Sequence, residues 1–573
     1  MTIFNPLKQE LTNLLNKAVK ACLFEGVDVE IERTKNDAFG DFQTNIALIL
    51  AKKLGKNPNE LAELIVTKIE QNEVIAKIEV KSPGFINIFL NNNYLLEQFL
   101  RSSQNKSFLK PNIGNQNKVV IEYSQPNIAK PLGVHHLLST IIGQSLVNLY
   151  QYLNFDVIKI NHIGDWGTQF GKLIYAYKTW GDEKEVLKNP IPKLLELYVK
   201  FHNEAEKDAR IEDKGREEFN KLENGDKENL RLWMWIRDLS LKEIKNTYNK
   251  IEGITFEDKD YIGESFYNDK MNEIIEDGKK KGVFKLSQGA LIAEIDDETP
   301  PLLVIKNDGS TLYATRDLAQ VKYRTSLGIK KNMMVVDVAQ SLHFKQFFYV
   351  AKKLGLNKGK QGEVVLEHVI FGRMQLPDKQ MSTRKGTVIL LDDLLDEAIL
   401  RSYKLVGELN PSLDEKRKKH IAKLSGLGAV KYNILSQNRI HNITFEWDKM
   451  ITLDGNSAPY LQYTHARALS VLGKNNVEVT DGMNIENCQE KDLLFAIFDF
   501  PDILNRSLEE DKPHHIAIYL YNLATLFNSF YNTCPIIKSK ESSRNLRLAL
   551  TAKVAEVIKI ALNLLVIEAP DEM

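Results

Sequence analysis

Two blocks in which short apolar runs alternate with helical segments constrain the fold of this chain more than any other feature. In the first block, VVIEYS (residues 119–124) has the composition of a buried strand, residues 134–155 carry apolar side chains at helical spacing, and FDVIKI begins another strand. In the second, strand-like PLLVIKN, NMMVVDVA and EHVIFG alternate with two helical segments. Such strand–helix–strand units predict a doubly wound, Rossmann-type parallel sheet with a ligand crevice at the carboxyl ends of its strands.

The segments around these blocks indicate a multidomain α/β protein. Residues 1–112 combine helical stretches with the strand-like IEVKSPGFINIFL, which predicts a small α+β domain. Residues 113–395 hold the Rossmann-type domain, with a charged and mostly helical insertion at about 172–300. Strand signals fade beyond it, and residues 396–573 predict an all-α helical bundle.

Composition excludes several classes of protein. With 573 residues and 43% hydrophobic positions, the chain has room for roughly three or four globular domains. Basic and acidic residues number 76 each, so any polyanion must be bound by local patches. The three cysteines are far apart, which excludes a disulfide framework and a cysteine-rich zinc site. We find no uncharged apolar run of about 18 residues and no signal peptide, so we expect a cytoplasmic protein that does not enter the membrane.

The loop after the first strand is the strongest candidate for a phosphate site, because the usual glycine-rich phosphate motifs are absent. Asn127, Lys130, Gly133, His135 and His136 lie within ten residues at the start of a helix. Free backbone N–H groups and the positive end of the helix dipole favour an anion there. A turn whose histidines only cap the helix is an equally good interpretation of these residues alone.

Two further segments have a similar character. KQMSTRKG (residues 379–386) mixes cations with glycine and hydroxyl side chains and could close over a polyphosphate, although a basic surface loop is the commoner explanation. NHIGDWGTQFG (residues 161–171) follows a strand, and its glycines allow close approach of a ligand. Its position at a strand end favours a pocket wall over a simple turn.

Tyr313 and Asp317 are four residues apart, so they project from one face of the predicted helix that follows PLLVIKN. A carboxylate beside a phenol suits a planar guanidinium, which needs a bidentate acceptor. The alternative is an exposed polar helix face on which Asp317 pairs with a nearby lysine or arginine.

Taken together, seven segments resemble those of the arginyl-tRNA synthetases, class I aminoacyl-tRNA synthetases. SQPNIAKPLGVHH resembles the H-I-G-H signature segment, NHIGDWGTQFGKL the segment on the next strand, and QMSTRKG an altered K-M-S-K-S loop. TLYATRDLA, AQSLHFKQ, YLQYTHARAL and IEAPDEM are also similar to segments of that family. The resemblance implies an amino-terminal domain that contacts the outer corner of tRNA, a Rossmann catalytic domain and a helical anticodon-binding domain.

This chain departs from the family pattern at two places. Gly133 replaces the first signature histidine and His135 replaces the signature glycine. The K-M-S-K-S equivalent lacks both lysines, and the resemblance implies that Lys130 supplies the missing charge.

The activity implied by the resemblance is that of an arginine–tRNA ligase. The enzyme would use ATP with Mg²⁺ to convert L-arginine to arginyl-adenylate and pyrophosphate, and would transfer arginine to the 3′-terminal adenosine of its tRNA, with activation dependent on bound tRNA. We expect no prosthetic group, no dedicated metal site and a monomer.

The resemblance also implies roles for individual residues. The catalytic residues would be Lys130, His135 and His136. ATP would be bound by Pro126, Gly133, His136, Gly164, Gln380, Met381, Ser382, Arg384 and Lys385. Arginine would be bound by Glu122, Asn127, Tyr313, Asp317 and Gln340. The tRNA would be contacted by Phe39, Gln43, Asn45, Tyr460, Gln462, Tyr463 and Arg467.

Two alternatives remain open at this stage. The altered histidine motif and missing lysines fit a catalytically inactive tRNA-binding relative. A class I synthetase for another amino acid is the second, although Asp317 and Glu122 disfavour an acidic substrate and the lack of metal-ligand cysteines disfavours cysteine.

Overall fold

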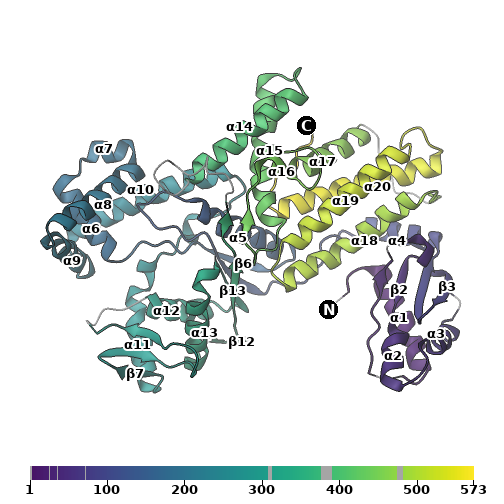
Figure 1. The fold of residues 1–573 in the computed structure, drawn as a ribbon, viewed down its shortest axis with the longest axis horizontal. Coiled ribbons are helices and arrows are strands. Elements are labelled where there is room, and N and C mark those ends of the chain that lie inside the picture. The colour runs from purple at the N-terminus through teal and green to yellow at the C-terminus, as the bar shows by residue number, and fades with distance from the viewer. Residues whose placement is uncertain are drawn as a thin grey trace.

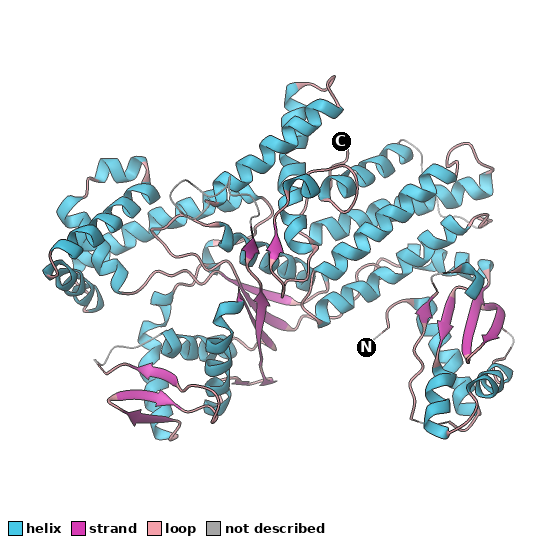
Figure 2. Cartoon of the chain, viewed as in Figure 1, coloured by secondary structure: helices cyan, strands magenta, loops and turns pink. Residues whose placement is uncertain are grey.

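The structure is a computed structural model that describes residues 3–573 apart from 25, 35, 71, 308–312, 376–389 and 474–481. The amino-terminal domain and the insertion helices lie at opposite ends of an elongated molecule, and the parallel sheet lies between them (Figure 1). Strands are concentrated in the small amino-terminal domain, the central sheet and a small sheet below the insertion, while the carboxyl-terminal part is helical (Figure 2). The predicted multidomain α/β fold class is thus confirmed.

The central sheet has four parallel strands in the order β13-β10-β5-β6. They are β5 (Lys118–Glu122), β6 (Asp156–Ile160), β10 (Lys331–Asp337) and β13 (Val365–Phe371). The central strands are apolar because α5 (Val134–Tyr152), α13 (Ser341–Leu354) and their neighbours cover the sheet. Helix α5 approaches β5 closely at Gly143, where an added Cβ would lie 2.2 Å from Cβ of Tyr123.

The prediction that PLLVIKN begins the second parallel unit is wrong. β9 (Leu302–Ile305) instead pairs antiparallel with β8 (Ala290–Ala293), which pairs with β7 (Phe284–Ser287). In β9, Leu303 is exposed between buried Leu302 and Val304, an alternation that suits a sheet with one free face. The second parallel unit therefore consists of β10, α13 and β13.

The amino-terminal domain is an antiparallel sheet of order β1-β2-β4-β3 packed on helices. IEVKSPGFINIFL forms a hairpin, in which two strands pair antiparallel on either side of a Pro-Gly turn. The elements are α1 (Pro6–Ala21), β1 (Glu32–Arg33), η1 (Asp37–Phe39), β2 (Phe42–Thr44), α2 (Ile46–Leu54), α3 (Pro58–Thr67), β3 (Ile75–Lys81), β4 (Phe85–Leu90) and α4 (Asn92–Gln104).

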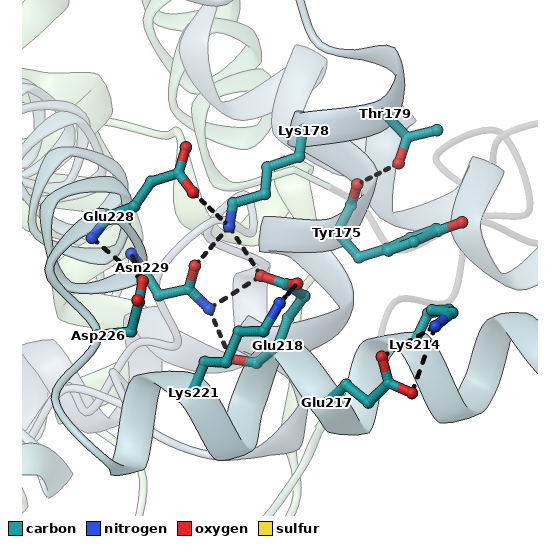
Figure 3. A network of polar contacts seen from close by, with 10 residues as sticks. All are labelled: Tyr175, Lys178, Thr179, Lys214, Glu217, Glu218, Lys221, Asp226, Glu228 and Asn229. Carbon is teal, nitrogen blue, oxygen red and sulfur yellow. Dashed lines mark hydrogen bonds and ion pairs between the residues drawn. The ribbon is translucent and has the colours of Figure 1, made fainter.

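The insertion is a helical bundle followed by irregular turns. Its elements are α6 (Thr168–Trp180), α7 (Glu183–Lys188), α8 (Pro190–Lys207), α9 (Arg210–Glu223), α10 (Lys227–Ile251), η2 (Asp258–Asp260), η3 (Glu264–Lys270) and α11 (Met271–Lys280). Lys178 of α6 donates to Glu218 of α9 at 2.8 Å and to Asn229 of α10 at 2.6 Å (Figure 3). Burial disfavours the charged form of Glu218, but hydrogen bonds from Lys178, Lys221 and Asn229 outweigh it and lower its pKa to about 2. This network fixes α10, which reaches the functional site.

Helices α14 to α20, between residues 391 and 564, form the carboxyl-terminal bundle, which contacts the amino-terminal domain through α18 (Cys488–Glu509). Phe42 and Phe495 meet edge to face at 5.4 Å, and Lys491 pairs with Asp41 at 2.8 Å. The remaining elements are α12 (Tyr313–Ser326), η4 (Val338–Gln340), β11 (Lys358–Gly359), β12 (Gly362–Glu363), β14 (Met374–Gln375), α14 (Leu391–Leu409), α15 (Glu415–Leu435), β15 (Ile443–Thr444), α16 (Trp447–Met450), α17 (Ala458–Leu472), α18 (Cys488–Glu509), α19 (His514–Thr533) and α20 (Glu541–Leu564). Across the described ranges, no helix is both long and apolar enough to span a bilayer.

Candidate active site

The sheet has a topological switch point between β5 and β10. From β5 the chain crosses through α5 to β6 on one side, whereas β10 lies on the other side and continues through α13 to β13. The loops that follow these strands therefore diverge and leave a crevice at their carboxyl ends. The described ATP and arginine candidates lie on these loops or on the helices that begin there, with three exceptions. Glu122 lies at the end of β5, and Tyr313 and Asp317 lie on α12, which follows β9 of the antiparallel sheet.

The first turn of α5 presents two adjacent imidazoles with centroids 3.9 Å apart, His135 and His136. The N–H of Gly133 donates to Nδ1 of His136 at 3.0 Å, so the neutral ring carries its proton on Nε2. Burial, together with the neighbouring His135, lowers the pKa of His136 to about 4. His136 is therefore a neutral hydrogen-bond donor near pH 7.

His135 is more exposed and faces the end of β10. Burial lowers its pKa, and the negative charge of Asp337 opposes that shift. Arg373, just beyond β13, lies 3.9 Å from the same carboxylate. Side chains from α5, β10 and the end of β13 thus surround one part of the crevice.

The loop between β5 and α5 has a strained backbone. Ser124, Gln125 and Ala129 all have positive φ, at 75°, 54° and 60°. Each such non-glycine conformation costs about 1–3 kcal/mol and persists only where the surroundings enforce it. Strain concentrated in one loop is typical of a functional site.

Helix α10 enforces this loop conformation from the insertion side. Tyr248 Oη lies 2.5 Å from Ser124 Oγ and accepts from Asn161 Nδ2 at 2.9 Å, so it joins the loops after β5 and β6. The N–H of Ala129 donates to Ser240 Oγ at 3.0 Å. Lys130 is exposed beside this contact, with Nζ 5.6 Å from the ring centroid of Tyr198 on α8.

Asn127 lies directly against Gly164. The N–H of Gly164 donates to the carbonyl of Pro126 at 3.0 Å, and Ile128 N–H donates to the carbonyl of Gly164 at 3.2 Å. A Cβ at position 164 would lie 2.0 Å from Asn127 Oδ1, so a larger residue would displace that side chain. The structure therefore brings together Pro126, Asn127 and Gly164.

Tyr313 and Asp317 lie at the start of α12, where two residues that sequence reasoning missed join them. His343 in the first turn of α13 contacts Asp317, with Nε2 and Oδ2 2.6 Å apart. Glu264 pairs with Arg316 at 3.2 Å. Burial raises the pKa of Glu264 to about 7, Arg316 opposes the shift, and the charges of Asp165 and Asp317 add to it.

Tyr313 is 61% exposed, and burial together with the charge of Glu264 raises the pKa of its phenol. Gln340 is exposed immediately before α13, one turn from His343. No motif distinguishes Glu264 in the sequence, since Arg316 lies 52 residues away along the chain. His343 belongs to the AQSLHFKQ segment, but the spacing of residues in the sequence did not predict that Asp317 would be its partner.

Glu122 occupies a different environment from the one predicted. It is 4% exposed and forms an ion pair with Arg324, which is fully buried. Gln320 Nε2 donates to Glu122 Oε2 at 2.8 Å, and Gln125 Nε2 donates to Oε1 at 2.5 Å. Because both carboxylate oxygens already have partners, we assign Glu122 to the support of the loop after β5 in place of the predicted guanidinium contact.

A cavity of about 410 Å³ is lined in part by the residues on either side of Glu264, Gly263 and Ser265. Its wall contains Trp166, Trp233, Arg237 and Phe266, together with Asn268, which accepts from Arg316 at 3.4 Å. Asp165, fully buried behind this wall, accepts from Ser265 and Arg237. Aromatic faces beside a guanidinium are suited to stacking on a nucleobase.

The tRNA candidates of the bundle lie away from the crevice, in α17. The Arg467 guanidinium lies 4.7 Å from the Tyr463 ring and 5.1 Å from the Tyr531 ring. Tyr460 Oη accepts from Asn528 Nδ2 at 2.9 Å. Of these side chains, Tyr463 and Arg467 line a cleft of about 1100 Å³.

Gln462 does not share that surface. It is fully buried and donates to the carbonyls of Glu568 at 2.9 Å and Leu424 at 3.4 Å. We therefore remove Gln462 from the expected tRNA contacts, because an interior amide with backbone partners cannot reach a nucleotide.

The amino-terminal candidates lie on one small domain, far along the molecule from the sheet (Figure 1). Phe39 is 46% exposed, Asn45 is exposed and Gln43 is half-buried. Gln380, Met381, Ser382, Arg384 and Lys385 lie outside the described residues. The described part of the chain has no group of three or more His, Cys, Asp or Glu side chains suited to a metal ion.

Comparison with known families extends over nearly the whole chain. The family described as "tRNA synthetases class I (R), catalytic domain" matches residues 97–447, "DALR anticodon binding domain" matches 461–573, and "Arginyl tRNA synthetase N terminal domain" matches 7–90. The arginine–tRNA ligase of Fusobacterium nucleatum is 42% identical over 99% of each chain, and that of Alkaliphilus metalliredigens is 39% identical over 99% of each.

Solved structures of arginyl-tRNA synthetases also resemble this chain over its full length. The arginyl-tRNA synthetase of Plasmodium falciparum superposes with a TM-score of 0.84 over all of both chains, at 26% identity. The Thermus thermophilus enzyme has the same fold, with a TM-score of 0.80 at 22% identity over 99% of this chain and 100% of that one.

The parallel sheet with its switch-point crevice and the matched catalytic domain define a class I aminoacyl-tRNA synthetase. Within that class, the chain belongs to the arginyl-tRNA synthetase family, which makes it a ligase that forms an aminoacyl-tRNA. Membership of this family sets aside the alternative of a class I enzyme for another amino acid.

Proposed function

We propose that this ligase joins L-arginine to its tRNA in two steps at the carboxyl edge of the parallel sheet. First, a carboxylate oxygen of arginine attacks the α-phosphorus of ATP in line, the bond to the β-phosphate breaks, and pyrophosphate leaves. Second, a ribose hydroxyl of the 3′-terminal adenosine attacks the arginyl carbonyl, and AMP leaves. Neither step bonds a reactant to the protein, so the residues orient the reactants and stabilise charge.

The observation that carries this proposal is the acidic group at the start of α12. Tyr313 and Asp317 lie one helical turn apart on α12, and Glu264, whose pKa burial raises to about 7, interacts electrostatically with each of them. A guanidinium is planar and permanently charged, so a carboxylate with a phenol beside it selects arginine over the compact ammonium of lysine. Asn127 and Gln340, both exposed on neighbouring loops, would hold the α-amino and carboxylate end.

ATP would lie at the start of α5. Here the Nε2–H of His136 and the helix N-terminus offer donors to phosphate, with His135 and Lys130 beside them. Gly133 and Gly164 let the chain approach the nucleotide closely, and Pro126 holds Gly164 in place. Mg²⁺ would arrive with ATP, as expected for a cation that binds substrate phosphates.

Both flanks of residues 376–389 are fixed next to this site. Leu391 N–H donates to the carbonyl of Leu132 at 3.0 Å, and Met374 pairs with Ile443. This placement supports a cationic contribution from the segment between them. The contacts of Gln380, Met381, Ser382, Arg384 and Lys385 with ATP stay predictions.

The tRNA would extend along the molecule. The aromatic cavity of Trp166, Trp233 and Phe266 suits a base of the acceptor end, and Tyr460, Tyr463 and Arg467 suit an unstacked anticodon base. Phe39, Gln43 and Asn45 would contact the tRNA elbow. We place the domain limits at 1–112, 113–395 and 396–573, and we infer a cytoplasmic monomer.

ATP–pyrophosphate exchange across a panel of amino acids, with and without unfractionated tRNA, tests the proposal. We expect arginine to be the only amino acid of the panel that supports exchange, and we expect that exchange to require added tRNA. Asp317→Asn should raise the KM for arginine about 100-fold or more, because it removes the charge that pairs with the guanidinium. Asp297→Asn, an exposed aspartate on the loop between β8 and β9, is the matched control and should behave as wild type.

The inactive tRNA-binding relative is the competing function, favoured by Gly133 and His135 at signature positions. Folded protein that binds tRNA but supports no exchange with any amino acid would establish that alternative. A normal KM for arginine in Asp317→Asn would show that the guanidinium binds elsewhere.

A further inference from the structure

His343 makes a short hydrogen bond to the aspartate that we place at the guanidinium. Its Nε2 lies 2.6 Å from Asp317 Oδ2, and the two side chains are 29% and 21% exposed. An ionised carboxylate only accepts hydrogen bonds, so Nε2 carries the proton. Among the residues the structure describes, no other side chain forms a hydrogen bond with that carboxylate.

The imidazole is itself held in place by the apolar side of α13. Its ring lies 5.1 Å from Phe347 and 6.2 Å from Phe344, measured between centroids. Both phenylalanines are buried, at 1% and 8% exposure. The ring therefore has a fixed orientation, unlike a side chain that moves freely in solvent.

We propose that His343 is a specificity-determining positioning residue, which fixes the plane of the Asp317 carboxylate so that Oδ1 faces the substrate guanidinium. This inference rests on the proposed function of Asp317. A carboxylate rotates readily about its last side-chain bond, whereas bidentate pairing with a guanidinium requires one plane. A donor on Oδ2 leaves Oδ1 and one lone pair of Oδ2 available to arginine.

The geometry predicts which substitutions preserve this role. A glutamine amide nitrogen reaches about as far from the backbone as imidazole Nε2, whereas an asparagine nitrogen reaches only as far as Nδ1. His343→Gln should therefore retain the hydrogen bond to Asp317, and His343→Asn should lose it. Both replacement side chains end in a neutral amide, so a difference between the two variants reports the length of the side chain and not its polarity.

The test is ATP–pyrophosphate exchange by the full-length enzyme with tRNA present. We expect His343→Asn and His343→Ala to raise the KM for arginine roughly 10- to 100-fold, the value of one hydrogen bond to a charged group. The KM for ATP and the rate at saturating arginine should change less than about twofold, because the ATP site lies at α5. His343→Gln should stay within about threefold of wild type in all three constants.

Asp317→Asn is assayed in parallel to separate two kinds of failure. If Asp317→Asn leaves the KM for arginine unchanged, the proposed pocket is wrong. If it raises that KM while His343→Asn and His343→Gln behave alike, only the positioning role is refuted. Equal increases in the KM values for arginine and ATP would indicate a general structural role and would also overturn the inference. Circular dichroism melting of each variant identifies any that do not fold.

Discussion

The ion pair between Glu122 and Arg324 offers a quantitative test of the corrected role of Glu122. Arg324 is fully buried, Glu122 is 4% exposed, and Arg324 Nη1 also donates to Asn332 at 3.4 Å. Burial disfavours the charge on Arg324, but Glu122 and Tyr267 together more than compensate and raise the pKa of the guanidinium. Arg324→Met keeps most of the side-chain volume and removes only the positive charge and its donors.

The expected cost follows from what remains beside the carboxylate. Breaking a buried pair leaves an uncompensated charge and costs about 3–5 kcal/mol. Gln320 and Gln125 still donate to Glu122, at 2.8 and 2.5 Å, so we expect the lower end of that range, about 3 kcal/mol. The double variant Glu122→Met with Arg324→Met should recover most of the loss, because it also removes the stranded charge.

Thermal melting followed by circular dichroism at pH 7.5 measures the effect, read from the first transition because a multidomain chain does not unfold in one step. A loss of about 3 kcal/mol lowers the melting temperature of a domain of this size by roughly 6–12 °C. A single variant as stable as wild type, or a double variant no better than the single one, would refute the reasoning. Glu122→Gln separates the two roles, since a substrate contact predicts a raised KM for arginine and a supporting role predicts lower stability.

Three further predictions concern other parts of the molecule. Since the pKa of Glu264 is raised to about 7, folding favours its protonated form, and its ionisation destabilises the protein as pH rises from about 4.5 to 7. Glu264→Gln should therefore be more stable relative to wild type at pH 8 than it is at pH 5. The difference in the free energy of unfolding should be at most about 3 kcal/mol in melting experiments. His136→Asn retains an acceptor for Gly133 N–H but loses the Nε2–H, and should slow exchange about 100-fold without changing the melting temperature. Phe495→Ala opens the contact with Phe42 and should weaken tRNA binding several-fold in filter assays while sparing ATP affinity.

Each of these predictions has an outcome that contradicts it. A Glu264→Gln effect that is the same at pH 5 and pH 8 would show that the carboxyl does not titrate between them. Exchange within threefold of wild type in His136→Asn would remove that imidazole from the phosphate site. Equal losses of ATP and tRNA binding in Phe495→Ala would mean that the interface supports the whole fold and not the amino-terminal domain in particular.

Local sequence pattern determined the elements that carry the site. Helical spacing over residues 134–155 and the preceding apolar strand placed His135 and His136 at a helix start, and the four-residue spacing of Tyr313 and Asp317 placed them on one helix face. The seven family segments in order were sufficient to indicate the catalytic class. These features depend on neighbours within one or two helical turns, which is why they can be read from the chain directly.

Contacts between distant segments were decided only by the tertiary structure. The composition of PLLVIKN predicted a strand, and β9 forms there, but nothing in that segment identified β8 as its antiparallel partner. Glu122 is separated from Gln320 by 198 residues, and Asp317 from His343 by 26, so no spacing rule pairs them. The periodicity of apolar residues identifies which face of a helix or strand is buried. Tertiary packing decides which other element covers that face, and therefore which charged side chains come into contact.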